Sequence, residues 1–304
     1  MSAPREHTLA VGDRAVHVLE WGSPDGELVL ALHGYPDTPW TWRRVAPAVA
    51  EDGVRVVAPY LRGYGPEGLA GDDCYQVGAG ACDVLALADV LSPDRPVHLV
   101  GHDWGAIIAT CAAATEPDRI ASLVCVAVPP IAMVLGPLAG PGKLWRHRRL
   151  AGRQLRMSWY AIANQVPWFS ERLMPRHIDR IWRTWSPGYD PAEDLRHLHE
   201  ALPTTAHWRA ALRYYRSLLS SGRGTPYRRA QQRRFAVPRL PLLYLHGVRD
   251  GCISVRHTDG LAARLTPGSD MVIVEAAGHF VQLEQPAVVA AEIRRWLAVA
   301  TAPG

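Results

Sequence analysis

The stretch Leu99-Val100-Gly101-His102-Asp103-Trp104-Gly105-Ala106 decides the fold of this chain. It continues a largely apolar run that starts at residue 97, which predicts a buried strand, and it leads into an alanine-rich run at 106–115, which predicts a helix. A glycine on each side of the central tripeptide indicates a sharp turn where neighbouring side chains would clash. The sequence therefore places the carboxylate of Asp103 at a strained turn between a strand and a helix.

A carboxylate at this position has a distinctive chemistry. The pattern G-x-x-x-G between a strand and a helix is typical of a turn that presents a nucleophile. A carboxylate can attack a saturated carbon, and water can cleave the ester that results. A serine that attacked the same carbon would form an ether, which water does not cleave. Asp103 thus predicts covalent chemistry at carbon followed by hydrolysis.

The bulk composition is that of a soluble globular protein. The 304 residues are 48% hydrophobic and 20% charged, with a formal net charge of +4, which suits one large domain or one domain with an insertion. No apolar stretch reaches the length of a membrane span, and residues 1–8 lack the apolar segment of a signal peptide. The arginine clusters contain no interleaved aromatics, so we expect neither a membrane nor a nucleic acid as a partner.

The cysteines bear on the compartment and on metals. The chain has five, an odd number, and no C-x-x-C pair. We interpret them as free thiols in a reducing environment and expect a cytoplasmic protein. Their spacing matches neither a zinc site nor an iron–sulfur site, and we expect no metal and no other cofactor. A homodimer stays open, because the sequence does not specify an oligomeric state.

Short apolar runs alternate with helical patterns over much of the chain, which is typical of a parallel α/β sheet. Helices are predicted at residues 78–91 and 288–298. Strands are predicted at residues 16–21, 28–32, 54–57, 97–100, 123–128, 242–245 and 271–274. We therefore predict an α/β fold with a mostly parallel central sheet flanked by helices.

The region between Pro130 and Pro241 breaks this alternation. It has almost no strand-like run and predicts helices at 150–165, 170–185 and 207–219. We predict a helical cap at residues 131–235, inserted into a core made of residues 1–130 and 236–304. Packing within the cap explains some of its tryptophans, and an apolar wall over a ligand site would explain others. The cap tryptophans are Trp145, Trp159, Trp168, Trp182, Trp185 and Trp208.

Three further motifs accompany Asp103. His33-Gly34-Tyr35-Pro36 ends an early strand, where the backbone N–H of Tyr35, together with that of Trp104, would hold an oxyanion. Asp250 follows a late strand and would orient a histidine, although Asp-Gly is also an ordinary turn. His279 lies on the loop before the last helix, which suits a general base. The chain order is nucleophile, acid, histidine.

With these motifs the chain resembles the α/β-hydrolase fold family over essentially its whole length. Within it, Gly101-His102-Asp103-Trp104-Gly105 and His33-Gly34-Tyr35-Pro36 look like the epoxide hydrolase branch, which is related to the haloalkane dehalogenases. The resemblance implies that Asp103, Asp250 and His279 form a catalytic triad. An earlier site that holds the acid in some relatives is Pro129-Pro130 here, which favours Asp250.

The resemblance also implies two cap tyrosines that hold and protonate the epoxide oxygen. Tyr160 precedes a Q-x-P segment and Tyr215 lies in a Tyr-Tyr-Arg run, so we assign them these roles, with Tyr214 as the alternative second tyrosine. We also expect substrate contacts from a set of aromatic residues. These are Tyr35, Trp104, Trp159 and Phe280.

The implied activity is the conversion of a hydrophobic epoxide to a vicinal diol through a covalent aspartyl ester. The alternative is a haloalkane dehalogenase, or another α/β-hydrolase activity that uses the same aspartate. In a dehalogenase Trp104 would serve as one halide donor, but the usual second donor, an asparagine, is replaced here by Tyr35.

Overall fold

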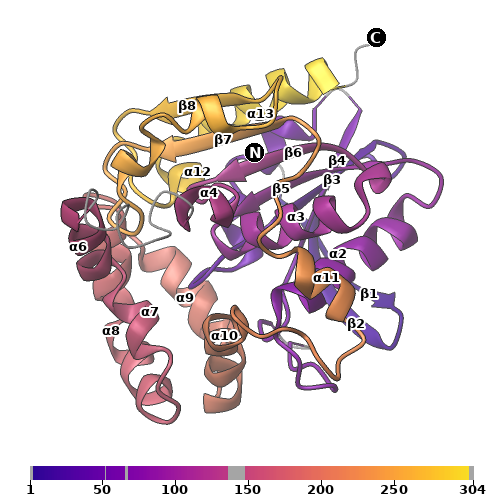
Figure 1. Cartoon of the computed structure of the whole chain (residues 1–304). Helices are drawn as coiled ribbons and strands as arrows, with labels where there is room; N and C mark the ends of the chain where they lie inside the picture. Colours follow the sequence, from indigo (N-terminus) through magenta and orange to yellow (C-terminus); the bar gives the residue numbers. More distant parts are fainter. Residues whose placement is uncertain (1–2, 52, 66–67, 136–147, 301–304) are drawn as a thin grey trace.

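An eight-stranded sheet organises the chain (Figure 1). The computed structural model describes residues 3–51, 53–65, 68–135 and 148–300. The strand order is β1-β2-β4-β3-β5-β6-β7-β8, with parallel pairing from β4 to β8 and antiparallel pairing of β2 with β1 and β4. The predicted mostly parallel α/β sheet is confirmed. The strands are β1 (Arg5–Val11), β2 (Arg14–Gly22), β3 (Glu27–Leu32), β4 (Val54–Pro59), β5 (Val97–His102), β6 (Ile120–Val126), β7 (Leu242–Gly247) and β8 (Asp270–Val274).

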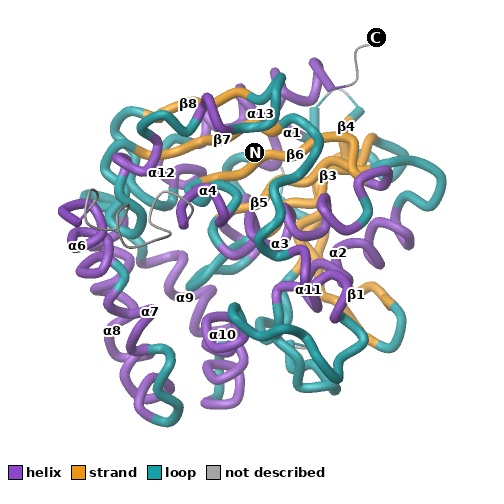
Figure 2. Tube along the Cα trace, viewed as in Figure 1, coloured by secondary structure: helices purple, strands orange, loops and turns teal. Residues whose placement is uncertain are grey.

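Helices cover both faces of the sheet, as the orange strands between purple helices in Figure 2 show. The helices α2, α3 and α11 bury apolar side chains on one face, while α1 and α13 do so on the other. The central strands therefore have two buried faces and read as continuous apolar runs. The helices are α1 (Ala46–Val49), α2 (Val77–Leu91), α3 (Trp104–Thr115), α4 (Ile131–Leu135), α6 (Arg148–Met157), α7 (Trp159–Ala163), α8 (Phe169–Trp185), α9 (Ala192–Ala201), α10 (Thr205–Ser217), α11 (Arg228–Arg233), α12 (Val281–Glu284) and α13 (Pro286–Ala300).

The first strand, β1, is absent from the sequence-based prediction. Its residues are mostly polar and exposed, because β1 is the sheet edge and pairs only with β2. Edge strands carry charged side chains, which removes the apolar alternation by which strands are found. The pattern of residues 5–11 thus reflects the place of the strand in the sheet.

The helices α7 to α10 lie together beyond one end of the sheet (Figure 1). The helix predicted at 150–165 is two helices, α6 and α7, separated at Ser158. The helix α9 was not predicted, because its charged residues hide an inner face that buries Leu195, Leu198 and Ala201. Of the cap tryptophans, Trp145 lies outside the described residues. Trp182, Trp185 and Trp208 are buried, whereas Trp159 and Trp168 are exposed.

The helix α11 falls inside the predicted cap range but packs on the core helices α2 and α3. The Gln231 side chain accepts the Gly78 N–H at the start of α2 at 2.8 Å, and its amide donates to the carbonyls of Ser217 and Ser220. The first bond ties α11 to the core helix α2, and the other two tie it to the carboxyl end of α10 and the loop after it. We therefore propose that the cap begins near residue 131, as predicted, and ends before α11.

None of the helices in the described ranges combines the length and apolar character needed to cross a membrane.

Candidate active site

Asp103 occupies the turn between β5 and α3 in an unusual backbone conformation, with φ 51° and ψ −117°. Most residues avoid this region of φ/ψ space, and such strain is concentrated at functional sites. A β-carbon on Gly105 would overlap the carbonyl of Leu32, and one on Gly34 would overlap the Asp103 side chain. These glycines let β3 and α3 approach closely enough to present the carboxylate.

The two oxygens of Asp103 have different partners. Oδ1 accepts the backbone N–H of Tyr35 at 2.8 Å, and Oδ2 lies 3.7 Å from Nε2 of His279. Tyr35 lies on the loop after β3 and precedes Pro36 through a cis peptide bond. The fold thus brings the predicted oxyanion-hole loop against the predicted nucleophile.

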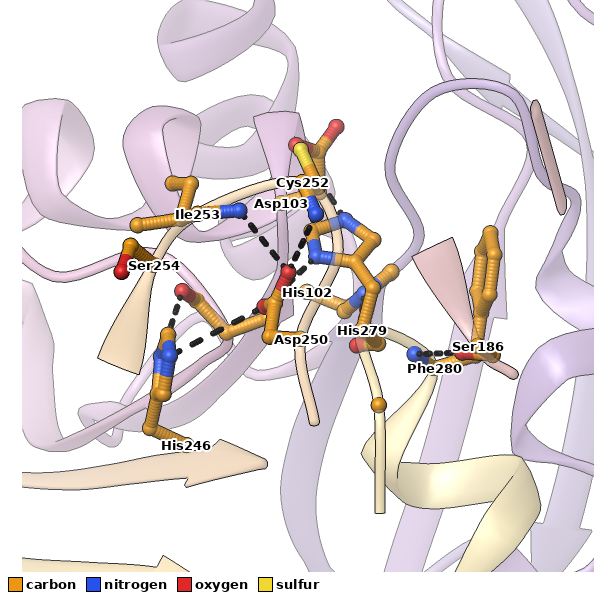
Figure 3. A network of polar contacts seen from close by, with 12 residues as sticks. His102, Asp103, Ser186, His246, Asp250, Cys252, Ile253, Ser254, His279 and Phe280 are labelled. Atoms are coloured by element: carbon orange, nitrogen blue, oxygen red, sulfur yellow. Dashed lines mark hydrogen bonds and ion pairs between the residues drawn. The ribbon is translucent and has the colours of Figure 1, made fainter. Parts of the chain in front are cut away.

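His279 and Asp250 are joined by a hydrogen bond of 3.0 Å between Nδ1 and Oδ2 (Figure 3). The other oxygen of Asp250 accepts the backbone N–H groups of Cys252 at 2.7 Å and Ile253 at 2.8 Å. Because Nδ1 donates to Asp250, Nε2 is left facing Asp103. The structure therefore brings the three predicted triad residues into one chain of contacts.

The charges of this cluster support one another. Burial disfavours ionisation of Asp103, but His279, His102 and the Tyr35 N–H outweigh it and hold the pKa of Asp103 below its ordinary value. Burial also opposes a charge on the His279 ring, but the Cys252 sulfur and the Asp250 and Asp103 carboxylates raise its pKa well above its usual range. The ligand-free site is thus an imidazolium between two carboxylates.

The carboxyl end of α8 contacts both the loop of Asp250 and the loop of His279. The carbonyl of Trp185 accepts the N–H groups of Gly251 and His279, each at 3.0 Å, and Oγ of Ser186 accepts the N–H of Phe280 at 3.0 Å (Figure 3). A helix carboxyl terminus carries partial negative charge, which favours a nearby imidazolium. The cap therefore contributes to the order and charge of the triad.

The cap tyrosines occupy different environments. Tyr160, on α7, is buried, and its Oη lies 3.2 Å from Sγ of Cys252. The ring of Tyr215, on α10, meets Tyr160, Trp104 and Tyr35 with centroid distances of 5.8, 4.9 and 5.2 Å. Tyr214 instead donates its hydroxyl proton to the carbonyl of Arg62 at 3.0 Å. The Tyr214 ring also meets Trp104, with a centroid distance of 5.6 Å, but its hydroxyl is engaged, and only the Tyr215 ring of the two also meets Tyr35 and Tyr160 within the described residues.

Burial governs the protonation of both tyrosines. It raises the pKa of Tyr160 and of Tyr215 well above the ordinary value, and the Asp103 carboxylate acts in the same direction. Both side chains are therefore neutral hydroxyls, able to donate a hydrogen bond at neutral pH.

Two of the expected substrate contacts lie elsewhere than beside Asp103. Phe280 is fully buried and stacks on Trp182 with a centroid distance of 3.5 Å, behind the catalytic histidine. Trp159 is 41% exposed and lines a surface hollow with Arg156 and Arg180. Contact of either residue with substrate stays a prediction.

Three residues at the site were missed by sequence reasoning. The Sγ of Cys252 lies with ligand atoms of Asp103 and His279 in a group whose members are all within 4.8 Å of one another. Nε2 of His102 contacts the carbonyl of His279 at 3.1 Å, and its Nδ1 lies 3.8 Å from Oδ2 of Asp37. His102 lies within the motif Gly101–Gly105, and Asp37 directly follows the motif His33–Pro36. Only the fold shows that the two side chains meet.

Asp37 gives a prediction about pH and stability. Burial, and then the charge of Asp194, raise the pKa of Asp37 from 3.8 to about 8, so the folded protein keeps this carboxyl protonated over a range in which the unfolded chain ionises it. The wild-type protein should lose stability as the pH rises from about 4 to about 8, and Asp37→Asn should lack this loss. The free energy of unfolding, measured with urea at about pH 5 and about pH 8, checks this. The difference between Asp37→Asn and the wild-type protein should move in favour of the variant by more than about 1 kcal/mol from the lower to the higher pH.

The exposed Asp25→Asn serves as the matched control for this measurement, since its carboxylate is in water in both states. An equal effect of Asp37→Asn at both pH values would contradict the assignment of a protonated Asp37.

Comparison with known proteins agrees with this geometry. Residues 27–286 match the family described as the alpha/beta hydrolase fold. Epoxide hydrolase A of Mycobacterium tuberculosis is 27% identical over 98% of each chain, and an epoxide hydrolase of Caballeronia sordidicola is 37% identical over 49% of this chain and 43% of its own. A solved epoxide hydrolase from Vigna radiata is 26% identical, with a TM-score of 0.75 over 98% of each chain. The sheet order, the strained turn at Asp103 and this match together show that the chain belongs to the α/β-hydrolase fold family.

Proposed function

We propose that this protein hydrolyses a hydrophobic epoxide to a vicinal diol through a covalent ester on Asp103. The observation that carries the proposal is a carboxylate at the strained turn, faced by the Asp250–His279 pair, with the rings of Tyr160 and Tyr215 in contact with each other and with Cys252 and Trp104 beside it. The names of the similar proteins, which are epoxide hydrolases, support the same reaction.

In the first step Oδ2 of Asp103, the oxygen not held by Tyr35, attacks one carbon of the epoxide ring. The new bond from oxygen to carbon replaces the ring bond, whose electron pair moves to the epoxide oxygen. Tyr160 and Tyr215 donate hydrogen bonds to that oxygen, and one of them supplies its proton. This donation is needed because an unprotonated alkoxide is a poor leaving group.

After the ester has formed, the imidazolium of His279 passes its proton to the tyrosinate, which restores the tyrosine hydroxyl. In the second step the neutral His279 takes a proton from water, and the hydroxide adds to the ester carbonyl carbon of Asp103. The Tyr35 N–H stabilises the oxyanion there. The ester bond then breaks, the carboxyl proton passes to the leaving alkoxide, and the diol leaves with the Asp103 carboxylate and the His279 imidazolium restored. The formation of the ester prepares this step, because it removes the negative charge that lies 3.7 Å from Nε2 and so lowers the pKa of His279. His279 becomes a base at the point where the reaction needs one.

A single-turnover experiment tests the ester. The enzyme is used in excess over styrene oxide, in water enriched in the heavy oxygen isotope. The first diol should then carry no label, because one of its oxygens comes from the epoxide and the other comes from Asp103. The label should then appear in the peptide that contains Asp103, as measured by mass spectrometry. Further turnovers should give labelled diol. Labelled diol in the first turnover would show direct attack by water and contradict the proposal.

A further inference from the structure

Two buried side chains near the proposed site have polar atoms without a hydrogen-bond partner. Tyr35 is 1% exposed and Asn164 is fully buried. Within the described residues, neither the Tyr35 hydroxyl nor the two polar atoms of the Asn164 carboxamide make a well-formed hydrogen bond. The two groups are neighbours, since the Asn164 side chain moderates the rise in the pKa of Tyr35 that burial causes.

Both residues are held by the elements that carry the proposed chemistry. The N–H of Tyr35 contacts Asp103, and its ring meets the edge of Tyr215. Asn164 follows Tyr160 by four residues at the end of α7, so the two side chains share one helix face. The pair therefore lies beside the reacting centre, where the core meets the cap.

The backbone of Asn164 is fixed independently of its side chain. Its N–H donates to the carbonyl of Tyr160 at 2.8 Å, and its carbonyl accepts Nε of Arg216 at 2.7 Å. The Arg216 guanidinium also binds Glu171 at 2.7 Å, so its charge is neutralised. The backbone of Asn164 is thus fixed, while the polar neighbour of its carboxamide is the Tyr35 hydroxyl, with which it makes no well-formed hydrogen bond within the described residues.

Leaving such groups unpaired is costly. A buried donor or acceptor without a partner destabilises a protein by about 1–3 kcal/mol. An apolar residue at either position would avoid the cost, as would a closed hydrogen bond between the two. Buried polar groups that wait for a partner are a feature of sites that select a polar ligand.

We propose that Tyr35 and Asn164 form a polar subsite for a neutral hydroxyl group on the epoxide substrate. A hydroxyl suits the pair because it accepts a hydrogen bond from the Tyr35 hydroxyl or the Asn164 amide N–H and donates one to the Asn164 carbonyl oxygen. A carboxylate does not suit it, because the neighbouring cation, Arg216, is already paired. The inference rests on the proposed function and narrows its substrate to an apolar epoxide that carries one hydroxyl.

Matched substrates test the subsite. Styrene oxide and its ortho-, meta- and para-hydroxymethyl analogues differ in one hydroxymethyl group and its position. Wild-type protein should prefer one analogue over styrene oxide by about 10-fold or more in kcat/KM. Asn164→Leu should reduce this ratio to near one. Tyr35→Phe, which removes the hydroxyl oxygen and keeps the ring, should reduce the ratio as well.

Gln165→Leu is the control, because Gln165 is the next residue and bears the same chemical group, but is exposed. It should leave the ratio unchanged. The absence of a preferred analogue, or an equal loss on all four substrates in Asn164→Leu, would overturn the subsite while leaving the proposed function intact.

Binding of the product diols and triols to wild-type protein, measured by calorimetry, separates the two proposals. If no epoxide is turned over, the proposed function fails. The subsite is then supported if one triol binds about 10-fold more tightly than the diol, and it is contradicted if none does.

Discussion

Replacing His279 with glutamine should leave the protein alkylated on Asp103 after it meets an epoxide. The intact mass should rise by the mass of one epoxide, and the added mass should map to the peptide that contains Asp103. The first step survives because an ionised carboxylate needs no base to become nucleophilic, and in this variant the Tyr35 N–H still donates to Asp103. The second step needs a base, whose loss should slow ester hydrolysis by about 10²–10⁴-fold.

The size of this effect follows from the isolation of His279. Its Nε2 is buried and has no well-formed hydrogen bond within the described residues. Of the described histidines near His279, His102 already contacts the carbonyl of His279 through its Nε2, and His246 faces Asp250 at 4.0 Å through its own Nε2. His102 also has its pKa lowered by burial to about 3, which makes it a poor acceptor of protons. No described neighbour is therefore placed to replace the base.

Asp103→Asn is the matched control, since it keeps the shape of the side chain and removes the nucleophile. It should give neither diol nor adduct. An adduct in Asp103→Asn, or its absence in a folded His279→Gln that still consumes epoxide, would show that the ester does not form on Asp103.

The elements that the sequence predicted well are those with two buried faces. The strands β3, β5 and β7 are almost wholly buried and rich in apolar residues. The loops or turns that follow them contain Gly34, Asp103 and Asp250, so the same segments indicate both the sheet and the candidate site. The edge strand β1 and the helix α9 lacked the apolar pattern that predicts an element, because many of their residues are charged and face solvent.

The site was predictable where a motif is continuous in the chain. Tyr215 was separable from Tyr214 only in the structure, since adjacent helical residues point in different directions and one of them is engaged by Arg62. Cys252 and Asn164 are ordinary in the sequence. Their importance arises from contacts between α7, the Asp250 loop and the β3 loop, which no local pattern encodes.

Removing the hydroxyls of Tyr160 and Tyr215 should abolish most epoxide opening while the nucleophile and the base of the site stay in place. In the double variant Tyr160→Phe/Tyr215→Phe, ester formation from styrene oxide should slow by more than about 10³-fold, because each preorganised donor to a developing oxyanion contributes about 10²–10³-fold. Rapid-mixing measurement of ester formation tests this directly, since it isolates the first step. Each single variant should show a smaller loss, because the remaining hydroxyl still donates.

A bromoalkane supplies the internal comparison, because bromide leaves without a proton. If the tyrosines act as donors to the epoxide oxygen, the double variant should form the alkyl ester from a bromoalkane at a rate close to that of the wild-type protein. Tyr214→Phe is the matched control, since its hydroxyl is spent on the Arg62 carbonyl, and it should open epoxides normally. Equal losses on both substrates in the double variant would mean that Tyr160 and Tyr215 shape the site by packing alone. Wild-type release of bromide with no diol from any epoxide would instead assign the same carboxylate to dehalogenation, because the nucleophile and base are common to both reactions and only the oxygen donors distinguish them.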